Sequence, residues 1–423
     1  MNIIRYIMKN YIILFPITLY VVYRAIKYIY DDEKCKKIYK SNFWRKQIDI
    51  NEFKTKNSNL FTKNLIPIPE KYIVHNLNIF DNYEDKSLVY YFIKNNYLKN
   101  QYYTIDYLQW RFKYSNKKFM IGLFKKNKKN VIKNDLLGTI FACPITLCID
   151  NDTNVNVLYI SFLCVKKELR GTGIAPILIS EMVRRWKSAK QYLFSFFIID
   201  DKPLPNMSIE KKILYNYLPI TRLNSNNKHN KNTSKNIIFK RINDSDDKNI
   251  NIAHKLFLKL SKNEWAVFQN LNIDEFKHYL FNDKLRIMTY FILNKDDNSN
   301  IGLISTIHNY MNNKDRKKIY DKNGYIVKDI GVSFIQFILI DKNIHKNIDK
   351  NNIINQFKKY YENNNYLSIN YLAHITDYNE NNIISKHIFK KGFIHTYNFS
   401  FNYMNKNSEK SSILDNGFMM LHP

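Results

Sequence analysis

The sequence predicts an α/β protein, with helices and strands mixed throughout, built from two domains of one plan. Its 423 residues are too many for one ordinary core. Strand-like and helical patterns alternate up to about Tyr217, and the same alternation resumes after a run of Asn, Lys and Ser from Asn224 to Ser234. No internal repeat is visible in the residues themselves. The expected units are an N-terminal segment 1–38, a domain 39–223, a linker or loop 224–235 and a domain 236–423.

Apolar spacing predicts the individual elements, because helices repeat every three to four residues and half-buried strands alternate. In the first domain the expected helices are Ser87–Asn95 and Asp106–Phe112, and the expected strands are Phe119–Phe124 and Leu136–Ala142. In the second domain the expected helices are Asn249–Lys262 and Asn352–Asn363. The expected strands there are Ile237–Ile242, Arg286–Leu293, Ile301–His308, Val332–Ile340, Tyr366–Ile375 and Tyr397–Met404.

The N-terminal segment contains an uncharged run, residues 10–23, between Lys9 and Arg24. As a helix this run spans about 21 Å, which is shorter than the roughly 30 Å hydrocarbon core. It can still hold at a membrane if the flanking basic side chains snorkel and the kink at Pro16 is tolerated. The segment therefore predicts a membrane anchor on the cytosolic face, and the alternative is an ordinary packed helix.

Charge and cysteine content narrow the class of protein. The formal net charge of +29 raises nucleic acid as a partner. The lysines are scattered among Asn, Ile and Tyr rather than gathered on a stripe, so we expect a solvated lysine surface and no nucleic-acid partner. The four cysteines form no CxxC pair and no metal spacing with histidine, which predicts buried thiols in a reducing, cytoplasmic compartment. They are Cys35, Cys143, Cys148 and Cys164.

The stretch Tyr159–Arg185 carries the strongest functional signal. It begins as an apolar, β-prone run, passes through the glycine turn Arg170–Gly173, and continues with apolar residues four apart from Ile174 onward. Pro176 suits the first turn of a helix. A strand, a glycine turn and a helix start together make an anion site, because unpaired N–H groups and the helix dipole both point out of the turn. The expected ligand is a pyrophosphate.

Arg170, Gly173 and Ala175 stand in an RxxGxA spacing, which is similar to the phosphate-binding turn of the GNAT acyltransferases. The wider stretch FLCVKKELRGTGIAPILISEMVRR resembles the eukaryotic N-myristoyltransferases, whose segment runs FLCVH, a basic turn, APVLI and a helix ending in RR. The resemblance covers roughly residues 40–423 and is thin in the second half. Shorter matching pieces are Phe43-Trp44 with Gln47, Asn96-Tyr97, Tyr103–Trp110, Leu137-Gly138, Lys202-Pro203, Ser333-Phe334 and Asn370 with Leu372.

That resemblance implies two pseudo-symmetric GNAT-like acyl-CoA N-acyltransferase domains around a saddle-shaped mixed sheet. It also implies a glycylpeptide N-tetradecanoyltransferase of lipoprotein biosynthesis, which moves a myristoyl group from myristoyl-CoA to the amine of an N-terminal glycine. Acyl-CoA and glycine-terminated peptides or proteins are then the partners of a monomer. Myristoyl-CoA is a co-substrate, with no permanently bound cofactor and no metal.

The resemblance also assigns residues. The backbone of Phe162 and Leu163 is expected to form the oxyanion hole, and the C-terminal carboxylate, here that of Pro423, to act as base. Tyr103 and Ser195 are expected on the peptide side. The expected acyl-CoA-binding residues are Phe43, Trp44, Leu163, Cys164, Val165, Arg170, Gly171, Thr172, Gly173, Ile174, Ala175 and Pro176.

Departures from the family pattern keep two alternatives open. The phosphate turn lacks the family's additional basic side chains, the family's acidic loop is replaced by the short, net basic run Leu98–Tyr102, and Phe197 stands where the family has glycine. The first alternative is a catalytically impaired acyl-CoA-binding or scaffold protein. The second is a GNAT acetyltransferase, which rests on the RGTG turn alone.

Overall fold

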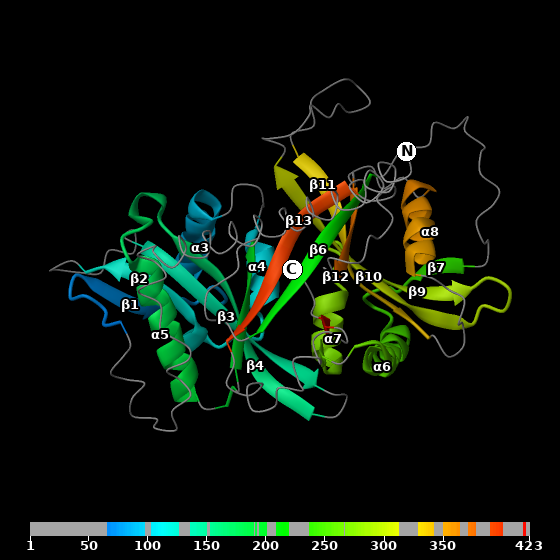
Figure 1. Ribbon diagram of the computed structural model, residues 1–423, viewed down its shortest axis with the longest axis horizontal. Coiled ribbons are helices and arrows are strands. Elements are labelled where there is room, and N and C mark those ends of the chain that lie inside the picture. Colours follow the sequence, from blue (N-terminus) through cyan, green and yellow to red (C-terminus); the bar gives the residue numbers. More distant parts are fainter. Residues whose placement is uncertain are drawn as a thin grey trace, which may run out of the picture.

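One large β-sheet runs through the whole molecule in the computed structural model (Figure 1), and it contains fourteen strands among the described residues. The structure describes residues 66–97, 103–126, 136–149, 153–189, 191–192, 194–200, 209–219, 237–265, 267–312, 329–341, 350–363, 371–377, 390–400 and 418–419. The predicted segment 1–38, the linker 224–235, Phe43, Trp44 and Pro423 lie outside these ranges.

The first half of the chain contributes six strands and three α-helices to the described structure. Its elements are β1 (Tyr72–Asn76), α3 (Tyr83–Asn96), α4 (Ile105–Phe112), the 3-10 turn η3 (Lys117–Phe119), β2 (Met120–Lys125), β3 (Leu136–Ile149), β4 (Thr153–Val165), the 3-10 turn η5 (Lys167–Leu169), α5 (Ile174–Ala189), β5 (Phe194–Asp200) and β6 (Ile209–Pro219).

The second half follows the same sequence of elements, with two short strands added. Its elements are β7 (Ile237–Arg241), α6 (Asp247–Glu264), β8 (Val267–Gln269), α7 (Ile273–Leu280), β9 (Ile287–Asn294), β10 (Asn300–Asn312), β11 (Asp329–Ile340), α8 (Lys350–Asn363), β12 (Tyr371–Asp377), β13 (Lys390–Ser400) and β14 (Phe418–Met419).

The order of the strands reveals an internal repeat that the residues did not show. It reads β1-β2-β3-β4-β5-β13-β6-β12-β11-β10-β9-β7, so each strand of one half has a counterpart at the mirrored place in the other. In both halves one pair is parallel, β4 with β5 and β11 with β12. At the centre the last strands are exchanged, because β13 lies between β5 and β6, and β6 lies between β13 and β12 (Figure 1). The predicted α/β fold with two pseudo-symmetric halves is confirmed.

Several elements are longer than the sequence predicted, and caps explain two helix starts. Asn82 accepts from the N–H groups of Glu84 and Asp85, so α3 begins at Tyr83 rather than Ser87. Asn272 and Glu275 form a capping box at the start of α7, which the sequence analysis did not predict.

Strand β3 continues seven residues past its expected end at Ala142, through Pro144. Proline lacks an N–H and is confined to places where the ladder has a free side. Among the described strands, β3 pairs only with β4 at Pro144, because its pairing with β2 ends at Phe141 and its pairing with β8 begins at Leu147.

Three buried apolar clusters hold the helices against the sheet. Helix α5 places its predicted four-residue series on the face toward β2, β3 and β4, and all four of these side chains are buried; they are Ile174, Leu178, Met182 and Trp186. Helix α8 buries Phe357 and Tyr361 in the same manner in the second half. A fully buried side chain of this size contributes about 1.5 to 3 kcal/mol. The largest cluster joins α4 to α7 and so connects the two halves.

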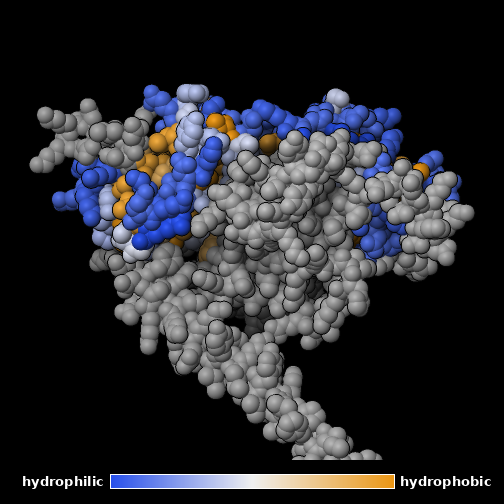
Figure 2. Space-filling model, turned by 90° about the horizontal axis from the view of Figure 1, so that it is seen from above, coloured by the Kyte–Doolittle hydropathy of each residue, from blue (hydrophilic) through white to orange (hydrophobic). Residues whose placement is uncertain are grey.

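Hydrophilic residues cover much of the described surface in the view of Figure 2, as expected from the net charge. None of the described helices is long and apolar enough to cross a membrane. In the part of the chain that the structure describes, no cluster of three or more His, Cys, Asp and Glu side chains is arranged to hold a metal ion. Cys143, Cys148 and Cys164 are free, buried thiols, as predicted.

Candidate functional site

Strand β4 carries a bulge at the two residues predicted to polarise a carbonyl. Thr139 pairs with Cys164 and Phe141 with Ser161, so two steps along β3 match three along β4. Phe162 takes a positive φ of 50°, a conformation that side chains other than glycine rarely adopt. The hydroxyl of Thr139 donates to the carbonyl oxygen of Phe162 at 3.1 Å inside the core. The bulge is therefore held from β3, and it turns the backbone at Phe162 and Leu163 out of the regular ladder.

The edge of β4 beside the bulge is open toward β5. The two strands pair in parallel from Val157 to Ile160, and no register between them continues from Ser161 to Val165 in the described strands. On its other side β5 pairs with β13 of the second half. Backbone N–H donors at such an opening can stabilise a developing negative charge, since they are fixed in place before any reaction.

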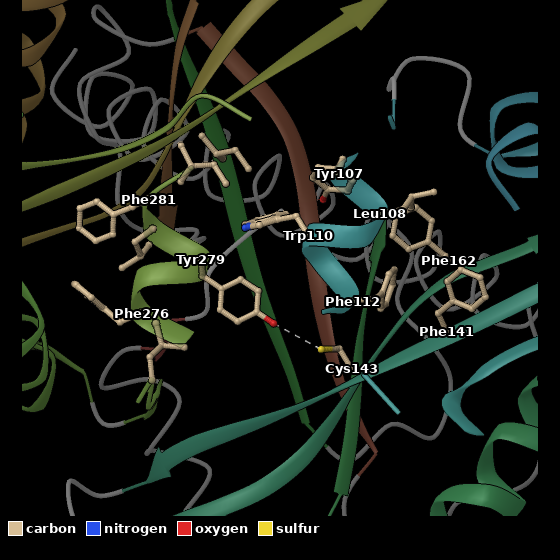
Figure 3. Packing of buried hydrophobic residues seen from close by; sticks show 14 of the residues in the cluster. Tyr107, Leu108, Trp110, Phe112, Phe141, Cys143, Phe162, Phe276, Tyr279 and Phe281 are labelled. Carbon is tan, nitrogen blue, oxygen red and sulfur yellow. Dashed lines mark hydrogen bonds between the residues drawn. The ribbon is translucent and has the colours of Figure 1, made fainter. Parts of the chain in front are cut away.

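Aromatic rings enclose the side chain of Phe162 and fix the bulge from the other face. The ring of Tyr97 stacks on the Phe162 ring with 5.2 Å between the ring centroids, and the ring of Tyr103 meets it edge-on with 4.9 Å between the centroids. Phe112 and Phe141 follow at 5.5 and 6.4 Å (Figure 3). Tyr103, predicted on the peptide side, is thus in direct contact with Phe162.

The glycine turn follows β4 and η5 as the sequence predicted. Gly171 and Gly173 have φ of 81° and 94°, which glycine adopts without strain, and α5 begins at the next residue, Ile174. The first N–H groups of a helix have no partner within it, so this turn presents donors to an anion. The hydroxyl of Thr172 is directed back into the turn, where it donates to the carbonyl of Leu169 at 2.6 Å.

Gly138 lets α5 approach the sheet closely at this point. A Cβ there would lie 2.7 Å from the Leu178 side chain and 3.0 Å from the backbone oxygen of Cys164. The thiol of Cys164 is itself buried, and burial raises its pKa to about 12 although Arg170 and Lys167 act against this. The thiol is therefore protonated and packs as an apolar group.

The C-terminal end of α3 is joined to the phosphate turn. The side-chain oxygen of Asn96 accepts from the N–H of Lys167 at 3.1 Å, and its backbone oxygen accepts from the guanidinium of Arg170. A cation is favourable at this end of a helix because of the dipole. The phosphate-binding role predicted for Arg170 stays a prediction, since its side chain is engaged at α3. Asn96 and its neighbour Tyr97 therefore support both the turn and the bulge.

Ser195, the other residue predicted on the peptide side, lies buried in β5. It is in register with Leu158 of β4 and with Ser400 of β13. It therefore stands on the strand that borders the opening.

Arg111 was not singled out from the sequence, yet it is the most unusual residue near the site. It is 2% exposed, and its guanidinium carbon lies 4.6 Å from the centre of the Tyr159 ring. Within the described part of the chain its Nε has no hydrogen-bond partner, and neither has the buried hydroxyl of Tyr107 one turn earlier on α4. Among the described residues no carboxylate forms an ion pair with Arg111. Leaving a buried charge without its partner costs about 3 to 5 kcal/mol.

The groups around Arg111 cannot supply the missing negative charge. Burial raises the pKa of the phenols of Tyr107, Tyr159 and Tyr279 above the ordinary value, although Arg111 lowers each. Burial likewise raises the pKa of the Cys143 thiol, which lies 3.9 Å from the Tyr279 oxygen (Figure 3). These four groups are neutral at pH 7. Burial lowers the pKa of Arg111, but the neighbouring phenol groups raise it by more. The pKa of Arg111 therefore lies above the ordinary value for arginine, and the side chain is charged.

A signal for Arg111 was present in the sequence. It follows Tyr107 by four residues in the predicted helix Asp106–Phe112, so it shares the face that carries the aromatic side chains. A charged residue on the buried face of a helix is rare unless it is paired.

Residues 50–197 match the family model described as "Myristoyl-CoA:protein N-myristoyltransferase, N-terminal domain". A putative glycylpeptide N-tetradecanoyltransferase of Acanthamoeba polyphaga mimivirus is 32% identical over 129 residues, which is 29% of this chain and 34% of the relative. The corresponding Plasmodium falciparum protein is 31% identical over 130 residues, 28% of this chain and 30% of the relative. The chain thus spans about a third of the length of these curated relatives. A Candida albicans glycylpeptide N-tetradecanoyltransferase extends the similarity to 300 residues at 24% identity, 66% of this chain and 60% of the relative.

Solved structures of yeast N-myristoyltransferase resemble the fold of this chain over most of its length. A Saccharomyces cerevisiae N-myristoyltransferase with bound myristoyl-CoA superimposes with a TM-score of 0.60 at 18% identity, and covers 80% of this chain and 85% of that one. A second structure of the yeast protein gives 0.58 at 17% identity, covering 79% and 80%.

The β4 bulge, the opening beside it and the glycine turn before α5 define a GNAT-like fold, present here in two pseudo-symmetric halves. The sequence match carries the assignment further. Residues 50–197 of the chain match the N-terminal domain of the N-myristoyltransferases, and the sequence similarity is concentrated there.

Proposed function

We propose that the chain is a glycylpeptide N-tetradecanoyltransferase, which moves a myristoyl group from myristoyl-CoA to the amine of an N-terminal glycine. The observation that carries the proposal is the bulge of β4 at an open edge, with Phe162 at positive φ. Curated relatives bear this name, and solved relatives hold myristoyl-CoA. A chain that only bound acyl-CoA would not need a strained backbone at this point.

On the acyl-CoA side, the thioester carbonyl would accept hydrogen bonds from the N–H groups of Phe162 and Leu163. A fixed donor of this kind contributes about 3 kcal/mol to the transition state. The N–H groups of the turn 171–174 and the start of α5 would hold the pyrophosphate, with Ala175 and Pro176 lining the entry. Phe43 and Trp44 complete the proposed cofactor site.

On the acceptor side, the neutral glycine amine attacks the thioester carbon, the tetrahedral intermediate collapses, and the CoA thiolate leaves. The amine loses one proton to a base and the thiolate gains one, so the products are an amide and CoA. We propose the carboxylate of Pro423 as this base, in line with the family resemblance. Tyr103, in contact with Phe162, and Ser195, on the bordering strand, would line the path of the peptide.

The remaining organisation is proposed on the same grounds. Residues 39–223 would bind the acyl-CoA and residues 236–423 the peptide, with 224–235 as the link between them. The protein would act as a monomer and attach to a membrane through residues 10–23. Flotation with liposomes tests the membrane attachment. The full chain is compared with a variant in which Leu14 and Val21 are both replaced by Asp, and the attachment is contradicted if both chains stay in the soluble fraction.

Two measurements on the full chain test the function. Saturating myristoyl-CoA should raise the melting temperature by several degrees, because a ligand that binds only the folded state stabilises it. CoA should then be released when a glycine-terminated peptide is added, and not when the same peptide carries an acetylated amine. Stabilisation without release identifies an acyl-CoA-binding protein. Transfer from acetyl-CoA but not from myristoyl-CoA identifies an acetyltransferase.

A further inference from the structure

The buried site around Arg111 contains donors that lack an acceptor. Arg111 has five N–H groups and accepts nothing; its guanidinium donates to the phenol oxygen of Tyr159, but its Nε has no partner in the described part of the chain. The buried hydroxyl of Tyr107 is also unpartnered there. Glu275, on the adjacent helix α7, is committed to the capping box, where it accepts from the N–H of Asn272 at 3.1 Å. Among the described residues the site therefore lacks a negatively charged group with two acceptor oxygens, and a carboxylate has that chemistry.

The site lies close to the position where the acyl group would react. Arg111 is followed on α4 by Phe112, whose ring meets that of Phe162 at 5.5 Å. The ring under Arg111 belongs to Tyr159, three residues before Phe162 on the same strand. Three residues of strand span about 10 Å. A carboxylate held by Arg111 is therefore about 10 Å from the bulge.

That distance corresponds to a short stretch of extended peptide. Successive residues of an extended peptide advance by about 3.3 Å. A side chain at the second to fourth residue of an acceptor peptide therefore reaches about 10 Å from the terminal amine, which matches the distance from the bulge to Arg111. A free amine at the thioester and a carboxylate at Arg111 can then belong to one molecule.

We propose that Arg111 binds an acidic side chain of the acceptor, so that the preferred substrates are glycine-terminated peptides with Asp or Glu at the second to fourth position. This rests on the proposed transfer to a glycine amine and names its substrate class. The formal net charge of +29 acts in the same direction, because a basic protein attracts acidic peptides.

The first test compares binding within three pairs of peptides, and the members of each pair differ only in Asp or Asn at the second, third or fourth position. Calorimetry is done on the full chain with a thioether analogue of myristoyl-CoA, which has no transferable acyl group. The Asp peptide should bind about tenfold more tightly or better, since a charge-assisted hydrogen bond is gained. Equal affinity within all three pairs overturns the proposal, whatever the protein does catalytically.

Variants assign the preference to Arg111. In Arg111→Gln the Asp and Asn peptides should bind equally, whereas Lys113→Gln, an exposed residue two positions further, should keep the preference. If Arg111→Gln does not fold, Arg111→Lys should fold and retain a reduced preference, because it keeps the charge but loses the planar fork. An unchanged preference in a folded Arg111 variant contradicts the proposal.

Turnover separates this inference from the proposed function. Release of CoA from myristoyl-CoA should have a higher kcat/KM with the Asp peptide than with the Asn peptide. The difference should come from a lower KM, with kcat unchanged. A binding preference without CoA release refutes the proposed activity and leaves the carboxylate site standing. CoA release without a preference supports the activity and refutes the site.

Discussion

Replacing Thr139 by Val tests whether the bulge is held from β3. The change keeps the shape of the side chain and removes the hydroxyl that donates to the Phe162 carbonyl at 3.1 Å. Thr139 is fully buried, so water cannot take the place of the hydroxyl. A typical hydrogen bond contributes about 1 kcal/mol, and a buried group left without its partner costs about 1 to 3 kcal/mol. We expect the free energy of unfolding to fall by about 1 to 3 kcal/mol.

The bulge should also lose its exact geometry, so acyl transfer should fall by about tenfold, which corresponds to about 1.4 kcal/mol of barrier. Unfolding in urea and CoA release measure the two effects. Thr139→Ser keeps the hydroxyl and should restore the transfer. The matched control is Thr289→Val, since Thr289 is equally buried and donates to the Leu280 carbonyl at 2.8 Å in the other half. If both Val variants lose the same stability and the same activity, the bulge has no special role.

Three further predictions concern other positions. Gly302→Ala should lower the free energy of unfolding in urea by more than about 2 kcal/mol, because the added Cβ would lie 2.1 Å from a backbone oxygen. Gly171→Ala should lower it by only about 1 kcal/mol, because the Cβ there has open space and only the φ of 81° is unfavourable. Similar values for the two variants would refute this reasoning. Among the residues that the structure describes, the buried Nδ1 of His308 has no partner, and burial lowers the pKa of His308 to about 3. The stability that its neutral form contributes is therefore complete above pH 6.5 and is lost as the pH falls below 6.5. Between pH 7.5 and 5.5 the wild-type protein should lose about 1.4 kcal/mol more than His308→Gln, and parallel curves would contradict this. Asn96→Leu should weaken binding of CoA itself several-fold by releasing the N–H of Lys167, and unchanged affinity would show that the turn is fixed without it.

Much of the fold could be predicted because its signals are local. The helical spacing from Ile174 to Trp186 and the glycine turn before it each depend on residues close together in the chain, and the structure has them where the sequence placed them. The similarity to the N-myristoyltransferases was also predicted from a contiguous stretch, and the family model matches residues 50–197. The acyl-CoA-binding and peptide-binding assignments remain predictions.

The missed features depend on residues that are distant in sequence. Strand β8 has three residues and exists because β3 and β14 pair with it, so no local pattern announces it. The support given by Asn96 to Lys167 joins residues 71 positions apart. The isolation of Arg111 could not be inferred either, because a sequence shows that a charge lies on an apolar face but not whether a carboxylate meets it there.

The exchange of β6 and β13 makes each half incomplete by itself. A fragment ending near residue 220 would expose one edge of β5 where β13 belongs, and β6 would have neither of its neighbours. Exposed strand edges favour aggregation. The native sheet therefore needs contacts between residues about 200 positions apart, such as Ser195 with Ser400, which are slow to form because long loops must close first. Folding should accordingly wait for the end of synthesis, and unfolding should remove both halves in one cooperative transition.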